Sequence, residues 1–357
     1  MKSITEIDPN FKLPESVPAG IQFLDPREAP FSIWGLAPND QGVYSRLPLE
    51  FLPECSEGVQ ALASHLAGAC VRFSTDADHL AVLWTLTDPT NMPHFTASGQ
   101  SGLQLFEESD DGIFHVKNLI PAMNAGLGCK LQQSSYFPLP GEMRHYALYL
   151  PLYNGLKELL LGFAPDAQVL PGRTPRIEKP ILFYGSSITQ GGCATKVGSC
   201  YSTILCRRLD AAQVNLGFSG NGMGEANMAE YIASIPMSVF VMDYDHNAPN
   251  AAHLEKTHMP FYRIIRKAQP DLPIVMVTCP DFERELQNAI ECRAVIRRNY
   301  ETAVAEGDQN VYFVDGETFF GTSERDLCTV DDCHPNDIGF LRMADVLEPI
   351  LRKILYP

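Results

Sequence analysis

The sequence predicts two domains, a β-sandwich of jelly-roll-like type followed by an α/β domain with a parallel sheet. The chain has 357 residues, which is more than one hydrophobic core usually serves. Its first half contains alternating apolar segments and turn signals, whereas its second half alternates apolar runs with helical patterns. A Pro-rich polar segment at 165–180 separates the halves. We therefore expect domains over residues 1–170 and 178–357.

Alternation of apolar and polar residues predicts the strands of the first half. In residues 79–86, every second side chain is apolar, the pattern of a half-buried strand. Residues 103–116 predict a hairpin, because Asp111-Gly112 supplies the positive φ of a tight turn. The same scheme recurs over residues 145–163 around Asn154-Gly155 and predicts a second hairpin.

The second half contains five short apolar runs without polar alternation, as in strands covered on both faces. They lie at 180–185, 213–218, 238–244, 272–277 and 311–315. Helical patterns follow at 199–211, at 225–234, in a stretch ending near Ala268, at 283–306 and at 338–355. Pro260 interrupts the third pattern, so that helix is expected to begin or kink there. Alternating strands and helices imply a parallel sheet with right-handed crossovers.

Composition and charge narrow the class of partner. The formal net charge of −16 disfavours nucleic acid and anionic membrane surfaces. There is no apolar run of membrane-spanning length, and the N-terminal residues do not have the pattern of an export signal. The ten cysteines contain no CxxC motif, and several lie in apolar runs. We expect most of them to be reduced core residues, which favours the cytoplasm.

Chemistry in a doubly wound sheet concentrates at the carboxyl ends of its strands. The first strand is followed by Gly185-Ser186-Ser187, where a serine hydroxyl can be exposed beside backbone amides. The segment is neither the GxSxG elbow of α/β-hydrolases nor a phosphate-binding P-loop. The alternative is an ordinary Ser/Gly-rich turn.

Two further strand ends offer hydrogen-bond donors. The glycines at 217–222, among them Gly220, allow a backbone amide to approach a ligand closely. A flexible loop or a phosphate cradle is the alternative. After the third strand, the Asn247 side chain is a second candidate donor, although asparagine is also a common turn former. His246 beside it is expected to be structural or to line the substrate site.

The fifth strand is followed by a candidate base. Asp331 and His334 are three residues apart in a turn, so the carboxylate can hold one ring nitrogen while the other accepts a proton. Pro335 keeps His334 out of helical geometry, and Asn336 can cap the last helix. The alternative is an acidic helix-capping turn.

The order of these four segments resembles the SGNH or GDSL-type hydrolases. The matching blocks are GSSIT (Ser187), SGNG (Gly220), DYDHN (Asn247) and DDCHPN (Asp331, His334). The resemblance covers about residues 178–355 and implies a flavodoxin-like three-layer α/β/α domain with a five-stranded parallel sheet.

Two positions depart from the family pattern. Ser186 stands where the family usually has an acid, and Ala248 follows Asn247 where Asp is frequent. The turn that carries the serine must therefore be supported differently. The GSSIT block and the N-terminal β-domain are similar to a two-domain bacterial branch of the family. Many members of that branch are thought to be carbohydrate O-acyl esterases.

The resemblance implies a serine esterase acting on small O-acyl esters, mainly acetyl, on carbohydrates. Ser187 is then the nucleophile, His334 the base and Asp331 its orienter, and the Ser187 amide, the Gly220 amide and the Asn247 side chain form the oxyanion hole. The expected partner is a small-molecule or oligosaccharide ester, and the mechanism requires neither a metal nor an organic cofactor.

Two other functions remain open, together with the source of substrate contacts. One is a catalytically silent glycan-binding protein on the same scaffold, and the other is a flavodoxin-like nucleotide-binding domain. We also expect the first domain to pack against the second and to contribute to the substrate-binding wall. Trp34 and Tyr44 are the candidates for exposed aromatic residues that stack on a sugar.

Overall fold

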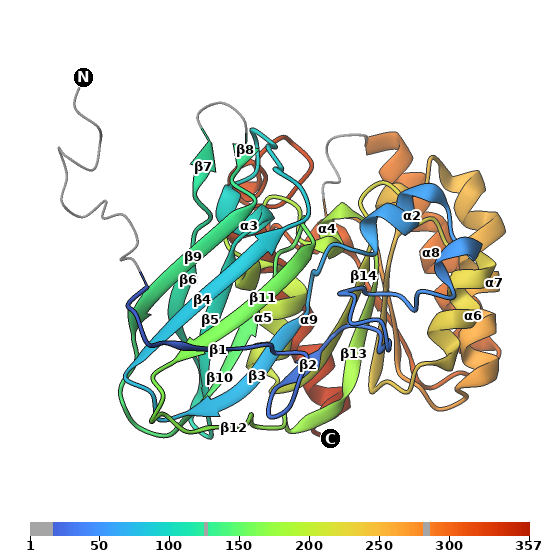
Figure 1. Ribbon diagram of the computed structural model, residues 1–357. Coiled ribbons are helices and arrows are strands. Elements are labelled where there is room, and N and C mark those ends of the chain that lie inside the picture. Colours follow the sequence, from blue (N-terminus) through green and yellow to red (C-terminus); the bar gives the residue numbers. More distant parts are fainter. Residues whose placement is uncertain (1–16, 125–127, 281–285) are drawn as a thin grey trace.

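The computed structural model describes residues 17–124, 128–280 and 286–357 and confirms the predicted fold class. A β-sandwich formed by the first half lies against an α/β domain formed by the second (Figure 1).

Two antiparallel sheets make the sandwich. One has the order β1 (Gln22–Leu24), β11 (Leu156–Phe163), β4 (His79–Leu86), β9 (Gln132–Pro138). The other has the order β12 (Val169–Pro171), β3 (Cys70–Thr75), β10 (Arg144–Tyr149), β5 (Leu103–Ser109), β6 (Gly112–Leu119), and β2 (Ser32–Trp34) also pairs with β3. The remaining elements are a small ribbon of β7 (Met123–Asn124) and β8 (Gly128–Cys129), the helices α2 (Glu57–Leu62) and α3 (Ala97–Gln100), and the 3₁₀ turn η1 (Leu52–Glu54).

One predicted hairpin forms and the other does not. β5 and β6 pair across the turn at Gly112, whose φ is +142°. The hairpin predicted around Asn154-Gly155 is wrong, because β10 and β11 belong to different sheets. Asn154 is buried, and its side chain donates to the Asp88 carbonyl (2.7 Å) and accepts from the Thr87 hydroxyl (2.9 Å). The Asn-Gly pair therefore lies in the segment that passes from one sheet to the other, not at the tip of a hairpin.

The second half is a parallel sheet of order β14 (Ala211–Gly217), β13 (Ile177–Gly185), β15 (Val239–Asp243), β16 (Ile274–Val277), β17 (Val311–Val314). Numbered along the chain within this domain, the order is 2-1-3-4-5, that of flavodoxin. Helices α5 (Tyr201–Arg208) and α9 (Asp337–Leu355) pack between the sheet and the sandwich, and α6 (Ala226–Ser234), α7 (Ala251–Ala268) and α8 (Leu286–Ala305) cover the other face (Figure 1).

The ends of the predicted helices shift by a few residues. α7 begins at Ala251, where the Asn250 side chain accepts from the His253 amide, and it continues through Pro260. A helix start at Pro260 is therefore wrong. Residues 283–285 of the predicted fourth helix lie outside the described part of the chain. None of the described helices is long and apolar enough to cross a membrane.

The two domains share a hydrophobic core. One cluster of buried residues joins Phe106, Tyr149 and Tyr153 of the first half to Phe183 and Phe340 of the second. Eight of the ten cysteines are buried, and no disulfide forms among those that the structure describes. Because the core is continuous, the sandwich is part of the scaffold that supports the strand ends of the parallel sheet.

Candidate active site

The turn after β13 presents Ser187 at the start of the short helix α4 (Ser187–Gln190). The Ser186 side chain caps α4 by accepting from the Ile188 amide, and Thr189 completes a capping box. A Cβ at Gly185 would lie 2.0 Å from the Asp243 carbonyl oxygen, so only glycine allows this close approach of β13 and β15. Ser187 is fixed by backbone geometry, with 5% of its surface exposed.

Ser187, His334 and Asp331 form a continuous chain of hydrogen bonds. His334 Nε2 lies 2.9 Å from Ser187 Oγ, and His334 Nδ1 lies 2.8 Å from Asp331 Oδ2. Because an ionised carboxylate only accepts, Nδ1 carries the ring proton and Nε2 accepts from the serine hydroxyl. The other Asp331 oxygen accepts from the amides of His334 (2.7 Å) and Cys333 (3.3 Å), which fixes the turn.

The environment favours an ionised aspartate and a basic imidazole. Partial burial alone would raise the pKa of Asp331, but hydrogen bonds from the His334 amide and ring hold it below its usual value. The pKa of His334 is raised, first by its hydrogen bond with Cys333 and then, against desolvation, by Asp331. An imidazole with this pKa is suited to general base catalysis near neutral pH.

The predicted oxyanion donors lie around the same strand ends. Within the described residues, no protein acceptor takes the amide N–H of Ser187 or of Gly220. Gly220 has a φ of +67°, and the space where its Cβ would lie is open. The Asn247 side chain donates to the Phe218 carbonyl at 3.0 Å and has a second N–H to offer. The two amides are thus available to a ligand oxygen, and Asn247 adjoins the loop that carries Gly220.

Asp243 supports the turn that carries Ser187, a role that was not predicted from the sequence. This buried carboxylate accepts from the Tyr201 hydroxyl (2.7 Å) and the Thr189 hydroxyl (3.0 Å). Burial raises the pKa of Asp243 to about 6. It ties β15 to α4 and α5 and so supports the turn that carries Ser186 and Ser187. Its position in the same block as Asn247 was the available signal.

The first domain contacts the serine turn directly. The Tyr153 hydroxyl donates to the Ser187 carbonyl at 3.1 Å. The Gln190 side chain donates to the Leu152 carbonyl (3.0 Å) and accepts from the Ser219 amide (3.0 Å). Gln190 thereby joins the sandwich, the serine helix and the loop that carries Gly220. Contacts between residues so distant in the sequence have no local signal.

Arg46 is a second link that the sequence does not reveal. Its buried guanidinium donates to the carbonyls of Gly217 (2.7 Å), Asn215 (3.0 Å) and Leu62 (2.7 Å), and lies 4.6 Å above the Phe218 ring. Burial lowers the pKa of Arg46 to about 9. It fixes the carboxyl end of β14, from which the loop with Gly220 departs.

His246 and Cys333, the residue before His334, are in contact. His246 Nε2 lies 3.1 Å from Cys333 Sγ. Burial would raise the pKa of the Cys333 thiol, but hydrogen bonds with His246 and His334 lower it to about 7. Whether His246 is structural or lines the substrate site stays a prediction.

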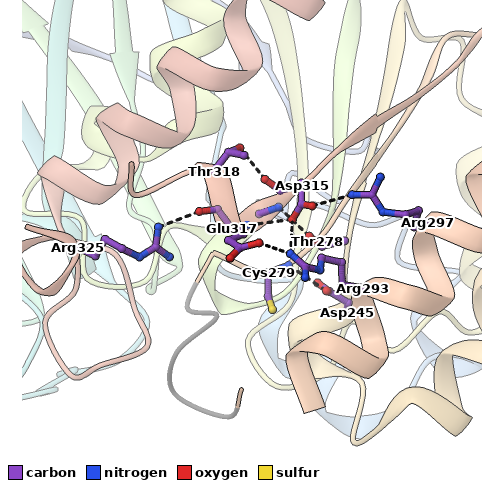
Figure 2. Close-up of polar contacts among 10 residues, drawn as sticks. Asp245, Thr278, Cys279, Arg293, Arg297, Asp315, Glu317, Thr318 and Arg325 are labelled. Atoms are coloured by element: carbon purple, nitrogen blue, oxygen red, sulfur yellow. Dashed lines mark hydrogen bonds and ion pairs between the residues drawn. The ribbon is translucent and has the colours of Figure 1, made fainter. Parts of the chain in front are cut away.

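A polar network anchors the chain between β17 and the turn that carries Asp331 and His334 (Figure 2). Asp315 accepts from Arg297 (2.8 Å), and Arg293 of α8 pairs with Glu317. The Glu317 carbonyl in turn accepts from Arg325 at 2.8 Å. These bonds hold the 3₁₀ turns η4 (Gly316–Thr318) and η5 (Arg325–Cys328) that lead to Asp331.

Of the two aromatic residues expected to stack on a sugar, only Tyr44 is buried too deeply to do so. Tyr44 is buried, with 4% of its surface exposed, so the expectation is wrong for this residue. Trp34 is partly buried in the shared core, with Arg72 5.2 Å from its ring. Tyr44 packs in the core of the sandwich, whereas stacking of Trp34 on a sugar stays a prediction.

The fold and this arrangement of serine, histidine and aspartate define a hydrolase of the SGNH class. Residues 178–352 match the GDSL-like lipase/acylhydrolase family, and residues 21–169 match the N-terminal domain of SGNH-hydrolase-type esterases. The chain belongs to the SGNH/GDSL hydrolase family in its two-domain form. No curated protein matches the sequence.

Solved structures share the fold over nearly the whole chain. A GDSL-like lipase candidate from Bacteroides ovatus ATCC 8483 is 28% identical, with a TM-score of 0.84 and coverage of 94% of this chain and 98% of that one. The salicylyl-acyltransferase SsfX3 of a tetracycline biosynthetic pathway is 18% identical, with a TM-score of 0.74 and coverage of 95% and 98%. A family two carbohydrate esterase from Clostridium thermocellum, in complex with cellohexaose, is 17% identical, with a TM-score of 0.56 and coverage of 82% and 94%.

Proposed function

We propose that this protein is a serine esterase that removes short acyl groups, mainly acetyl, from carbohydrates. The observation that carries the proposal is the hydrogen-bond chain from Asp331 through His334 to Ser187. A serine, an imidazole and a carboxylate in this order are the groups that acyl transfer through a covalent intermediate requires.

In the proposed mechanism, Ser187 Oγ attacks the ester carbonyl while His334 Nε2 takes its proton. The Ser187 and Gly220 amides and the Asn247 side chain stabilise the negative oxygen of the tetrahedral intermediate. His334 then returns the proton to the leaving alcohol. A water molecule, deprotonated by His334, hydrolyses the acyl-enzyme and regenerates the serine.

Gly192 packs closely beside the serine turn, between Tyr153 of the first domain and His334 of the second. A Cβ at Gly192 would lie 2.9 Å from the Tyr153 hydroxyl and 3.1 Å from His334 Cδ2. Space beside the serine is therefore limited by both domains. The shared fold with the esterase bound to cellohexaose supports a carbohydrate as the alcohol component.

The test is a screen of the purified chain against acetylated sugars and p-nitrophenyl esters of graded chain length. We expect hydrolysis that declines as the acyl chain lengthens and is fastest on an acetylated sugar. A protein that binds glycans but hydrolyses none of these esters would be the silent binding protein instead. Transfer to an added alcohol in preference to water would indicate an acyltransferase.

A further inference from the structure

Three side chains from different segments meet beside the serine. His94 lies on the loop between β4 and α3 of the first domain, Cys193 follows the serine helix, and His334 is the proposed base. One ligand atom of each, a ring nitrogen or the sulfur, lies within 4.8 Å of the other two. The rings of His94 and His334 have their centroids 6.1 Å apart.

Among the described residues, two of these three side chains make no hydrogen bond. Across the described residues, neither the His94 ring nor the Cys193 thiol has a hydrogen-bond partner. His94 is exposed and Cys193 is buried, so the cluster is open on one side and closed on the other. The Nε2 atom of His334 lies 2.9 Å from Ser187 Oγ.

We propose that His94, Cys193 and His334 bind a thiophilic divalent cation, Zn²⁺ fitting best, and that the ion inhibits the enzyme. Two imidazoles and one thiolate are a ligand set that zinc accepts, with a fourth position left for water. Tetrahedral coordination needs ligand atoms ~3.4 Å apart, which follows from Zn–N bonds of ~2.1 Å and Zn–S bonds of ~2.3 Å. Binding therefore requires side-chain rotations that shorten separations of up to 4.8 Å toward this value.

Binding of the ion releases one proton from the protein. Burial raises the pKa of the Cys193 thiol to about 12, so the ion displaces the thiol proton to solvent as the metal–sulfur bond forms. The two histidines bind as neutral rings. The His334 nitrogen that binds the metal can no longer accept a proton from Ser187, so the bound enzyme lacks its base.

A second set of candidate ligands, Asp331, Cys333 and His334, also lies within 4.8 Å, but these side chains already make several hydrogen bonds. Asp331 accepts from the His334 ring and from two amides, and Cys333 is bonded to His246. A metal there would have to displace most of these bonds. The first set gives up only the contact between His334 and Ser187, which is why we favour it.

The test uses the full chain and two assays. Inhibition is measured with Zn²⁺, and binding is measured with Cd²⁺ from the ultraviolet absorption of the cadmium–thiolate bond. Inhibition of p-nitrophenyl acetate hydrolysis is scored relative to each variant's own metal-free rate. We expect reversible inhibition, relieved by a chelator. In Cys193→Ser and His94→Ala, the half-inhibiting Zn²⁺ concentration should rise about tenfold or more. Cys333→Ser, the matched control, should stay as sensitive as the wild type.

Binding is measured separately from catalysis. Ser187→Ala should keep the Cd²⁺ absorption and Cys193→Ser should lose most of it, whether or not the protein is an esterase. Wild-type Zn²⁺ sensitivity in both Cys193→Ser and His94→Ala would overturn the proposal. Loss of sensitivity in Cys333→Ser would overturn it in favour of the second set.

Discussion

Ser186 and Ser187 are neighbours with different environments. The Ser186 hydroxyl faces back into the helix and caps it, whereas the Ser187 hydroxyl meets the His334 ring. We expect Ser187→Ala to lower turnover by on the order of 10⁴ or more. Ser186→Ala should remove a helix cap worth ~1 kcal/mol and keep most of the activity. Steady-state kinetics would measure the turnover, and urea unfolding would measure the stability. If Ser186→Ala were inactive and Ser187→Ala active, Ser186 would be the nucleophile instead.

The pH dependence of activity should report the His334 ring. The base works only when neutral, so activity should rise with pH through one ionisation, with its midpoint above the ordinary ~6.5 because the pKa is raised. Cys333→Ala and Asp331→Asn each remove a group that raises this pKa, so both should move the midpoint to lower pH. Asp331→Asn should also lower turnover by on the order of 10³ to 10⁴. A pH profile unmoved in both variants would contradict the proposed role of His334.

Sequence reasoning at the residue scale succeeded where chemistry is local. Asp331 and His334 are three residues apart, and their spacing was enough to predict their contact. Arg46 and Tyr153 carried no such signal, because their partners at Gly217 and Ser187 are far away in the chain. Tyr44 was expected at the surface because aromatic residues in a β-rich half serve both cores and binding faces, and only the packing distinguishes them.

At the scale of elements, Asp243 connects the strand β15 to the helices α4 and α5. Its pKa of about 6 is higher than the ordinary 3.8, so the folded protein holds a proton that the unfolded chain releases. Stability from this group is therefore present at low pH and lost as pH rises through about 6. The difference corresponds to ~3 kcal/mol.

Asp243→Asn should remove this pH dependence while keeping an acceptor for Tyr201 and Thr189. Unfolding by urea at about pH 4 and about pH 7 would measure it. Between the two values the wild type should lose ~2 kcal/mol relative to the variant, less than the full difference because the unfolded carboxyl is already partly ionised at about pH 4. Parallel pH dependence of the two proteins would show that Asp243 ionises normally.

The elements themselves were largely predictable. Apolar runs gave the five parallel strands, since strands covered on both faces have little polar alternation. The Asn154-Gly155 pair misled because the same residues suit a tight hairpin and a buried crossing between sheets. Pro260 misled because a proline that suggests a helix boundary can also lie within a long helix such as α7.

At the scale of the whole molecule, the shared core makes the two domains interdependent. Residues 171–357 expressed alone would expose the apolar faces of α5 and α9 and lose the contacts of Arg46 and Tyr153. We expect this fragment to be insoluble or unfolded, and co-expression with residues 1–170 to restore activity. Circular dichroism and an ester assay would check it. A folded, fully active fragment would show that the sandwich is only an attached module.

Covalent labelling tests whether Ser187 is a nucleophile that His334 activates. An alkyl fluorophosphonate captures a serine only when a base activates it, and peptide mass spectrometry locates the adduct. We expect one adduct per chain, on Ser187, formed by the wild type and Ser186→Ala but not by His334→Ala. An adduct on another residue, or an active enzyme that no label reaches, would contradict it.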